Sequence, residues 1–330
     1  MKRFQENQST VQVFYFQGFL ISSEQQVFML IAIMLIYIFI LFGNALIALL
    51  VCLSPQLQNP LYIFLGNFSF TEICYTSVII PQTLVHIVTV SKSISYTGCL
   101  LQLYFCSSFG CTESLLLSTM AYDRYLAICH PLHYSSLMRS SVCMMFSLLC
   151  WTAGFLGSLL PLLMVSKLVF CGPNKINHFF CDSLKLFALS CSDIYTSKLS
   201  LFLFASAVVL GSSVLILSSY AFILGTIFTM SSTVAKQKAF STCASHLMVV
   251  SLFYGTLIFM YIASPAMENN EVNKGIALIY TVVTPMLNPI IYSLRNSDIH
   301  RVLYLQMVKV QMFLYGKFNG PIHLLMFADK

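Results

Sequence analysis

The stretch Val27–Val51, VFMLIAIMLIYIFILFGNALIALLV, contains no charged side chain. Crossing the hydrocarbon core of a bilayer as a helix takes about 20 residues, so this stretch is long enough to span a membrane. The whole chain has the same character: 58% of its 330 residues are hydrophobic and 8% are charged, whereas a soluble domain carries roughly 25% charged residues. Water cannot solvate so much apolar surface, but lipid can. The sequence therefore predicts a membrane protein.

Charge-free gaps recur along the rest of the chain, and each is long enough for a further helix. The gap between Glu24 and Glu72 contains two spans, which are separated by the polar, proline-flanked turn Ser54–Pro60. We expect an all-α membrane protein, a seven-transmembrane helix bundle with a short C-terminal interfacial helix. Its spans are expected near residues 27–51, 60–84, 98–122, 141–165, 199–224, 239–262 and 275–294.

An odd number of spans places the two ends of the chain on opposite sides of the membrane. Lys and Arg residues divide almost evenly between the sides, so orientation depends on Asn7, which begins the glycosylation triplet Asn7-Gln8-Ser9. We therefore expect residues 1–26 to be an extracellular tail, 27–294 the receptor domain, and 295–330 a cytoplasmic tail. An amphipathic interfacial helix in that last tail is predicted by the apolar spacing of Ile299, Leu303, Met307, Val310 and Leu314.

Four cysteines fall on the expected outer, oxidising side of the membrane: Cys99, Cys171, Cys181 and Cys191. An even number favours two disulfide bonds. Four cysteines allow three pairings, and the spacing alone does not choose among them. Two bonds would hold the long loop between the fourth and fifth spans over the end of the bundle.

Two polar motifs stand where hydrocarbon makes polar groups costly. Met120–Tyr125 (MAYDRY) ends the third span, and Pro285–Asn296 (PMLNPIIYSLRN) ends the seventh. Pro289 frees a backbone carbonyl and permits a bend. Either motif alone could be an interfacial anchor or a structural kink. Together with Lys238–Leu247 (KAFSTCASHL), and in this order along the chain, the motifs are specific enough to indicate a protein family.

On these motifs the chain resembles the odorant receptors, a branch of the rhodopsin-like G-protein-coupled receptors. The resemblance covers about residues 18–300 and includes Gly43-Asn44, Asn59–Tyr62, Ser219-Tyr220 and Phe253–Gly255. It implies a receptor in the plasma membrane, not an enzyme, that binds a small, mostly apolar volatile ligand. It also implies that the partner is a stimulatory olfactory-type heterotrimeric G protein and that activation raises cyclic AMP. Membrane lipid is an expected partner, and nucleic acid is not. Among the three cysteine pairings, we take Cys99–Cys181 with Cys171–Cys191.

The resemblance further implies a cytoplasmic switch. Arg124 is expected to be held by Asp123 at rest and released on activation, with the neighbouring Tyr125 in the same motif. Tyr220, Asn288, Pro289 and Tyr292 complete the implied set of switch residues. Many relatives outside the odorant branch tie this Arg to an acid at the inner end of span six, but this chain has Lys236 and Lys238 there. Other contacts must therefore hold the resting state.

Two acids lie deep in the expected spans, Glu72 in the second and Glu113 in the third. A carboxylate in the bilayer needs a partner or a proton, and two facing one polar cavity would share a proton or hold a cation. The resemblance suggests a sodium site that includes Asn288. The alternative is that both acids are hydrogen-bonded core groups. Apart from this possible ion, the sequence predicts no cofactor and no metal.

Positions that match the family's ligand pocket lie in the outer half of spans three, five and six. Their helical spacing gives an apolar wall with few hydroxyl groups, and Tyr261 is expected to donate the orienting hydrogen bond. For each position, ordinary helix packing is the alternative role. The expected ligand-binding set is Cys106, Ser107, Gly110, Phe204, Val208, Tyr254, Ile258 and Tyr261.

Other membrane proteins are less consistent with the sequence. A transporter would show internal repeats, and none is visible. An intramembrane enzyme would need a constellation such as His-Glu-x-x-His, which is absent, and a retinal protein would need a Lys in the seventh span, where the expected residues 275–294 contain none. A rhodopsin-like receptor for another kind of small molecule is the nearest alternative.

Overall fold

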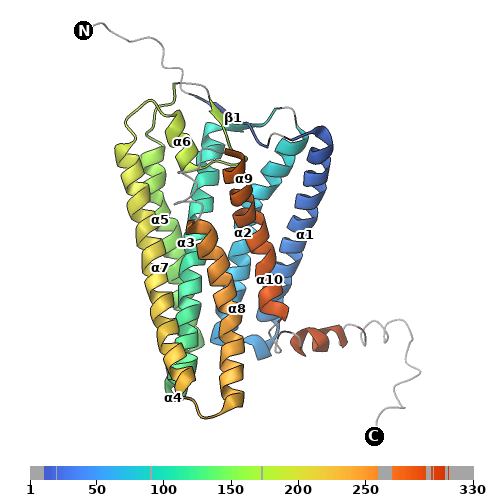
Figure 1. Cartoon of the computed structure of the whole chain (residues 1–330), viewed down its shortest axis with the longest axis vertical. Helices are drawn as coiled ribbons and strands as arrows, with labels where there is room; N and C mark the ends of the chain where they lie inside the picture. The colour runs from blue at the N-terminus through green and yellow to red at the C-terminus, as the bar shows by residue number, and fades with distance from the viewer. Residues whose placement is uncertain are drawn as a thin grey trace.

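The computed structural model describes residues 11–19, 21–89, 91–171, 174–258, 270–294, 299, 301–308 and 311. Long helices run side by side through it (Figure 1). Among the described residues, six are long and apolar enough to cross a membrane, and Cys243–Ile258 is a shorter apolar one. The predicted seven-helix bundle is confirmed. Its spans are α1 (Ser23–Leu53), α2 (Pro60–Val88), α3 (Tyr96–Cys129), α5 (Ser140–Val165), α7 (Tyr195–Thr229), α8 (Thr233–Ile258) and the broken seventh span α9 (Asn270–Leu278), η4 (Ile279–Val283) and α10 (Thr284–Leu294).

Several of these helices extend beyond the predicted spans, because their caps lie outside the apolar stretches. The Ser22 hydroxyl accepts from the amide of Gln25, and the Gln25 side chain accepts from the amide of Ser22, which together start α1 at Ser23. Asn59 and Ser95 cap α2 and α3 without a reciprocal bond, their side chains accepting from the amides of Tyr62 and Gly98. The apolar pattern therefore locates each span, while short-range hydrogen bonds fix its ends.

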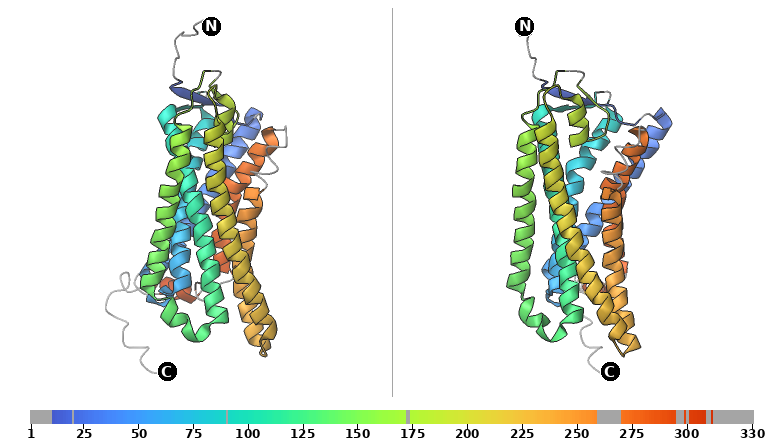
Figure 2. Two further views of the ribbon diagram at one scale, coloured as in Figure 1. Left: turned by 90° about the vertical axis from the view of Figure 1, so that its left-hand side faces the viewer. Right: turned by 60° about the vertical axis from the view of Figure 1, so that its left-hand side comes forward.

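α3 and α2 form the centre of the bundle, and α7 and α1 its lipid-facing rim. In the apolar windows of α2 and α3, 56% of residues are buried, against 22% in α1 and 11% in α7. The two views in Figure 2 show α7 and α5 on one flank of the bundle. Because the central helices contact protein on most sides, they carry the polar groups that lipid would not tolerate.

A three-stranded sheet covers one end of the bundle, which is called the sheet end below. Strand β1 (Val13–Phe16) pairs antiparallel with β2 (Ser93–Ser95) and parallel with β3 (Lys175–Ile176). The sequence predicted only a tail in residues 1–26. The strand forms because Phe14 and Phe16, on one face, are buried against the bundle, and four residues are too few to show that pattern beforehand.

Both disulfide bonds lie at the sheet end. The structure joins Cys99, at the start of α3, to Cys181, and Cys171 to Cys191. These are the two pairings taken from the resemblance. The segment between them contains β3 and the short helix α6 (Ser183–Leu189), so the long loop before α7 is tied to itself and to the central helix.

The opposite end, called the Arg124 end, carries the short helices α4 (Pro131–Leu137) and η1 (Pro55–Leu57). Beyond α10, residues 301–308 are helical, and Ile299 and Val302 are buried while Met307 is exposed. A helix after the seventh span is therefore present, but Met307, a predicted member of its apolar face, is exposed, and the amphipathic interfacial character stays a prediction. Predicted members Val310 and Leu314, and residues 321–330, lie outside the described residues.

Candidate functional site

The first polar cluster in the bundle is a junction of three hydroxyl groups from three helices. The Tyr254 hydroxyl on α8 bonds to the hydroxyls of Ser114 on α3, at 2.9 Å, and Ser212 on α7. Ser114 and Ser212 are themselves 3.0 Å apart between their Oγ atoms. All three side chains are buried, so the junction links α3, α7 and α8 inside the bundle.

Only Tyr254 of this junction was among the predicted ligand-binding residues. Ser114 and Ser212 were missed, although each lies one helical turn beyond a predicted position, Gly110 on α3 and Val208 on α7. A search for polar side chains one turn deeper along the predicted wall would have found both.

The other predicted pocket residues divide between the bundle interior and helix contacts. Cys106, Ser107 and Val208 are half-buried, and a Cβ at Gly110 would lie 3.7 Å from the Tyr280 hydroxyl, so Gly110 faces the seventh span. Phe204 instead packs at the α5–α7 contact, since a Cβ at Gly157 would lie 2.7 Å from its ring.

Ile258 ends α8 and is half exposed. Tyr261, the expected hydrogen-bond donor, lies outside the described residues. The role of each of these positions in ligand binding stays a prediction.

The two buried acids face a shared polar region between α2, α3 and α10. Glu72 accepts a hydrogen bond from the Asn288 amide through Oε1, and its carboxyl group interacts electrostatically with that of Glu113. Three oxygens there are buried with no hydrogen-bond partner among the described residues: Glu72 Oε2, Glu113 Oε1 and Asn288 Oδ1. Unpaired oxygens of this kind are suitable ligands for a hard cation. The described residues contain no group of three or more His, Cys, Asp and Glu that suits a metal.

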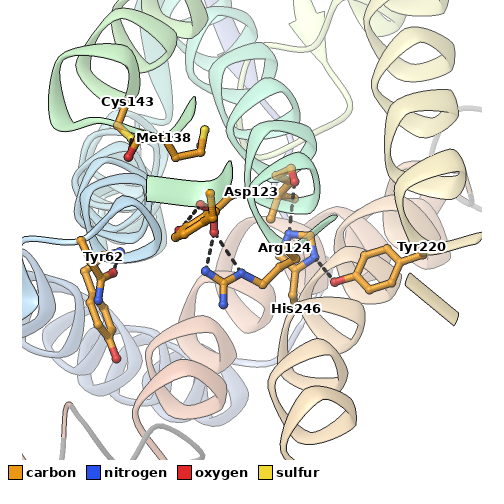
Figure 3. A network of polar contacts seen from close by, with 10 residues as sticks. Tyr62, Asp123, Arg124, Met138, Cys143, Tyr220 and His246 are labelled. Atoms are coloured by element: carbon orange, nitrogen blue, oxygen red, sulfur yellow. Dashed lines mark hydrogen bonds and ion pairs between the residues drawn. The ribbon is translucent and has the colours of Figure 1, made fainter. Parts of the chain in front are cut away.

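Near the Arg124 end, Asp123 binds Arg124 and is completely buried. Its second oxygen accepts a hydrogen bond of 2.8 Å from the hydroxyl of Tyr134 on α4. Both carboxylate oxygens of Asp123 are therefore satisfied, and Arg124 is held against its own helix (Figure 3). Tyr125 lies aside from this pair, with its hydroxyl 2.9 Å from His130 Nε2.

Near the same end, His246 on α8 forms hydrogen bonds with both α7 and α3. Its Nδ1 lies 2.8 Å from the Tyr220 hydroxyl on α7, and its Nε2 lies 3.1 Å from the Leu117 carbonyl oxygen on α3. Because the carbonyl can only accept, Nε2 carries the hydrogen and Nδ1 accepts from Tyr220. Figure 3 shows the His246 ring joined to the Tyr220 hydroxyl. The sequence has no acid at the inner end of span six that could form an ion pair with Arg124. The neutral hydrogen bond from His246 instead joins α8, the sixth span, to α3.

The seventh span approaches the switch through Tyr292 and Pro289. The Tyr292 hydroxyl is buried with no hydrogen-bond partner among the described residues, while its ring packs edge-on to Phe68. Pro289 lies against α1, where a Cβ at Gly43 would come within 3.1 Å of it. Gly43 therefore permits close contact between α1 and α10, and Tyr292 has a hydroxyl available for a new partner.

At the sheet end, the loop that crosses the bundle is packed rather than loose. His178 is buried and stacks on Phe179. Burial, together with the nearby charges of Lys185 and Lys274, lowers the pKa of His178 to about 3. A ring with that pKa stays neutral at ordinary pH, so His178 serves as an aromatic packing group and not as a charged ligand contact.

The fold is a seven-helix membrane bundle, with a hydroxyl junction inside it and a held Asp-Arg pair at one end, as expected for a rhodopsin-like receptor. The model of the olfactory receptor family matches residues 33–310. Olfactory receptor 11H6 of Homo sapiens is 46% identical over 290 residues, covering 88% of each chain. Olfactory receptor 6N1 of Homo sapiens is 41% identical over 304 residues, 92% of this chain and 97% of that protein. The chain belongs to the olfactory receptor family: it is an odorant G-protein-coupled receptor, not an enzyme.

Breaking the His246 bridge is expected to raise basal signalling. In His246→Leu, the Tyr220 hydroxyl loses its partner and the α8–α3 bond disappears, at a cost of about 1–3 kcal/mol for a buried polar group left unpaired. Ligand-independent cyclic AMP should rise, while the melting temperature of the purified receptor should fall. Met248→Leu, a change on the exposed side of the same helix, is the matched control. Unchanged basal signalling and stability in His246→Leu would contradict this role.

Proposed function

We propose that this receptor binds small, mostly apolar volatile ligands in the sheet-end half of the bundle, between α3, α7 and α8. The sheet end, with the glycosylation triplet at Asn7, faces the extracellular side of the plasma membrane, and the Arg124 end faces the cytoplasm. Ligand binding activates a stimulatory olfactory-type G protein and raises cyclic AMP. Asn7 lies outside the described residues, so its support comes from the sequence.

The observation that carries this proposal is a pair of hydrogen-bonded layers joining the same three helices. The first layer is Ser114, Ser212 and Tyr254; the second is the Leu117 carbonyl, Tyr220 and His246. On α7 and α8 the two layers are about two turns apart, or roughly 12 Å. A ligand that displaces one hydroxyl of the first layer therefore changes the positions of the helices that make the second, and two-layer packing of this kind has discrete arrangements.

The Arg124 end also offers a surface for the G protein. Leu132 on α4 is 91% exposed, the largest exposed fraction among the large apolar side chains of the described residues. α4 contacts the switch directly through the bond from Tyr134 to Asp123. A partner that covers Leu132 would gain apolar burial of about 1.5–3 kcal/mol and would contact the helix that is bonded to the Asp123–Arg124 pair.

The proposed function is tested by co-expressing the receptor with an olfactory G protein and measuring cyclic AMP against a broad panel of volatiles. A saturable rise to one or a few related volatiles is expected, and it should be absent in Leu132→Asp. Responses only to polar, involatile compounds would favour the alternative, a receptor for another small molecule. Protease or label reaching the Asp123–Tyr125 end from outside intact cells would contradict the orientation.

Removing one hydroxyl from the first layer should change ligand potency without removing the pocket. Tyr254→Phe keeps the ring and leaves Ser114 bonded to Ser212. A hydrogen bond contributes about 1 kcal/mol, so potency for ligands with a carbonyl or hydroxyl should fall about fivefold. The measurement is a set of dose-response curves, with pure hydrocarbon ligands as the internal control. An equal loss for hydrocarbons would show that Tyr254 acts through packing.

We also propose that Glu72, Glu113 and Asn288 hold a sodium ion, supported by the three unpaired oxygens between them. An ion that binds only the folded receptor stabilises it by about 1.4 kcal/mol at ten times its dissociation constant. Melting temperature should therefore rise with NaCl but not with choline chloride at equal ionic strength, and Glu72→Gln should remove the difference. Equal curves for both salts in the unaltered receptor would mean that the acids are only hydrogen-bonded core groups.

A further inference from the structure

A second cavity lies at the sheet end, away from the hydroxyl junction. It is bounded by β1 and the turn after it, by the first turns of α1, by the last turns of α2, and by the loop that carries Phe179. None of the predicted ligand-binding residues lines it. Its walls are mainly apolar and aromatic, with Phe16, Phe19, Met29 and Phe179 among them.

One wall carries a buried histidine with one unsatisfied ring nitrogen. His86 on α2 is 7% exposed, and its Nδ1 atom has no hydrogen-bond partner among the described residues. Its Nε2 lies 3.3 Å from the carbonyl oxygen of Ser93. Since a carbonyl can only accept, Nε2 carries the hydrogen in the neutral ring and Nδ1 presents a lone pair. A group that satisfies His86 must therefore donate a hydrogen.

Lys92, a cationic side chain on the same cavity, requires a ligand group that accepts a hydrogen bond. Lys92 lines the cavity, and its amine lies over Gly18, where a Cβ would be 3.4 Å from Nζ. An ammonium group donates and never accepts. A hydroxyl group meets both conditions, because its hydrogen can go to His86 Nδ1 while its oxygen accepts from Lys92. An ammonium would be repelled by Lys92, and a hydrocarbon would leave Nδ1 unpaired.

The walls are fixed before any ligand arrives. The Phe16 amide donates to the Lys92 carbonyl at 2.7 Å, the Phe16 ring lies 5.0 Å from that of His86, and Phe19 stacks on Phe179. The Gly18 carbonyl accepts from the buried amine of Lys274 on α9. Binding to a preformed site costs less conformational entropy than binding to a mobile one. The bond from Lys274 to Gly18 also connects this site to the seventh span.

The space suits the polar end of a small molecule. The cavity measures about 20 Å³, and one water needs about 10–15 Å³ on the same measure. It therefore has room for a hydroxyl or hydroxymethyl group, and the apolar remainder of a ligand would extend out of it past the aromatic rings.

We propose that this cavity is a second ligand site, which binds apolar molecules bearing a hydroxyl group, with the hydroxyl placed between His86 and Lys92. Two sources supply that chemistry: a free volatile alcohol, or a sterol from the surrounding lipid. The proposal is independent of the ligand pocket between α3, α7 and α8, because the two sites share no lining residue.

Photolabelling of the full-length receptor in nanodiscs distinguishes the sources. One arm uses sterol-free lipid and an aliphatic alcohol carrying a diazirine; the other uses a photoreactive sterol in the bilayer without added alcohol. Labelled positions are mapped by mass spectrometry. Labels are expected around Met29 and Ile87 in at least one arm, and excess 1-hexanol should compete with them while excess hexane should not.

Variants then test the hydroxyl recognition. His86→Phe keeps an aromatic ring against Phe16 but removes the acceptor, and labelling at this cavity should fall about fivefold, equivalent to about 1 kcal/mol. Met29→Trp, which alters no polar group, should block the cavity from the α1 side. The melting temperature of each purified variant serves as the folding control. Absence of label in both arms, equal competition by hexane, or full labelling of folded His86→Phe would each overturn the proposal.

Discussion

Cys99→Ser is expected to remove most of the receptor from the cell surface. Loss of a native disulfide costs about 2–5 kcal/mol in small secreted domains, and a comparable loss here would release the long loop from α3. Cys99 and Cys181 are completely buried, and the Cys181 amide donates to the Gln102 side chain at 2.9 Å. Surface immunolabelling of a tagged receptor, normalised to total expression, measures the effect.

Cys171→Ser is the matched comparison for that experiment. This bond closes a sequence separation of 20 residues, against 82 for Cys99–Cys181, and a longer closed loop restricts the unfolded chain more. Cys171 and Cys191 also lie on the exposed side of the loop. Surface expression should therefore fall less in Cys171→Ser than in Cys99→Ser. An equal or larger loss in Cys171→Ser would contradict the structural role given to the α3 bond.

Arg124→Met is expected to abolish signalling and also to destabilise the receptor. The substitution leaves Asp123 completely buried with the Tyr134 hydroxyl as its remaining side-chain partner. Removing one charge of a buried ion pair lowers the free energy of unfolding by about 3–5 kcal/mol. We expect a loss near the lower figure, because Tyr134 still donates a hydrogen bond to Asp123. The measurements are thermal unfolding of the purified receptor and odorant-stimulated cyclic AMP.

The partner substitution separates stability from signalling. Asp123→Asn keeps an acceptor for Tyr134 but removes the charge that pairs with Arg124. Basal cyclic AMP should therefore rise in Asp123→Asn, whereas Arg124→Met should give no signal. The double variant should be more stable than Arg124→Met alone, because it contains no unpaired buried carboxylate. If Asp123→Asn lowered basal signalling with normal surface expression, the resting restraint assigned to Asp123 would be wrong.

The spans could be predicted because lipid imposes a strict rule on charge. Val27–Val51 and the later charge-free gaps predict helices, and α1, α2 and the other spans lie where they were expected. The switch role of the Asp123-Arg124 pair came from the resemblance, because two charges at the end of an apolar span could equally be an interfacial anchor. For the spans, by contrast, the spacing of charges was enough.

Contacts between distant parts of the chain could not be predicted in the same way. The bridge from Tyr220 to His246 and on to Leu117 depends on how α3, α7 and α8 are rotated about their axes, and hydropathy does not fix rotation. The wider turn η4 at Ile279–Val283 also shifts the register of the seventh span. The sheet required three segments from residues 13 to 176 to meet, which no local pattern encodes.

The most direct measurement is the distance between spin labels on α4 and α8 by double electron–electron resonance, with and without odorant and G protein. Leu137 and Val234 are exposed, described positions near the Arg124 end, and Cys52→Ser removes the exposed native thiol. Ligand and G protein together should lengthen the distance by several ångströms, and His246→Leu should lengthen part of the population without ligand. An unchanged distance in samples that activate the G protein fully would contradict a switch that opens between α3 and α8.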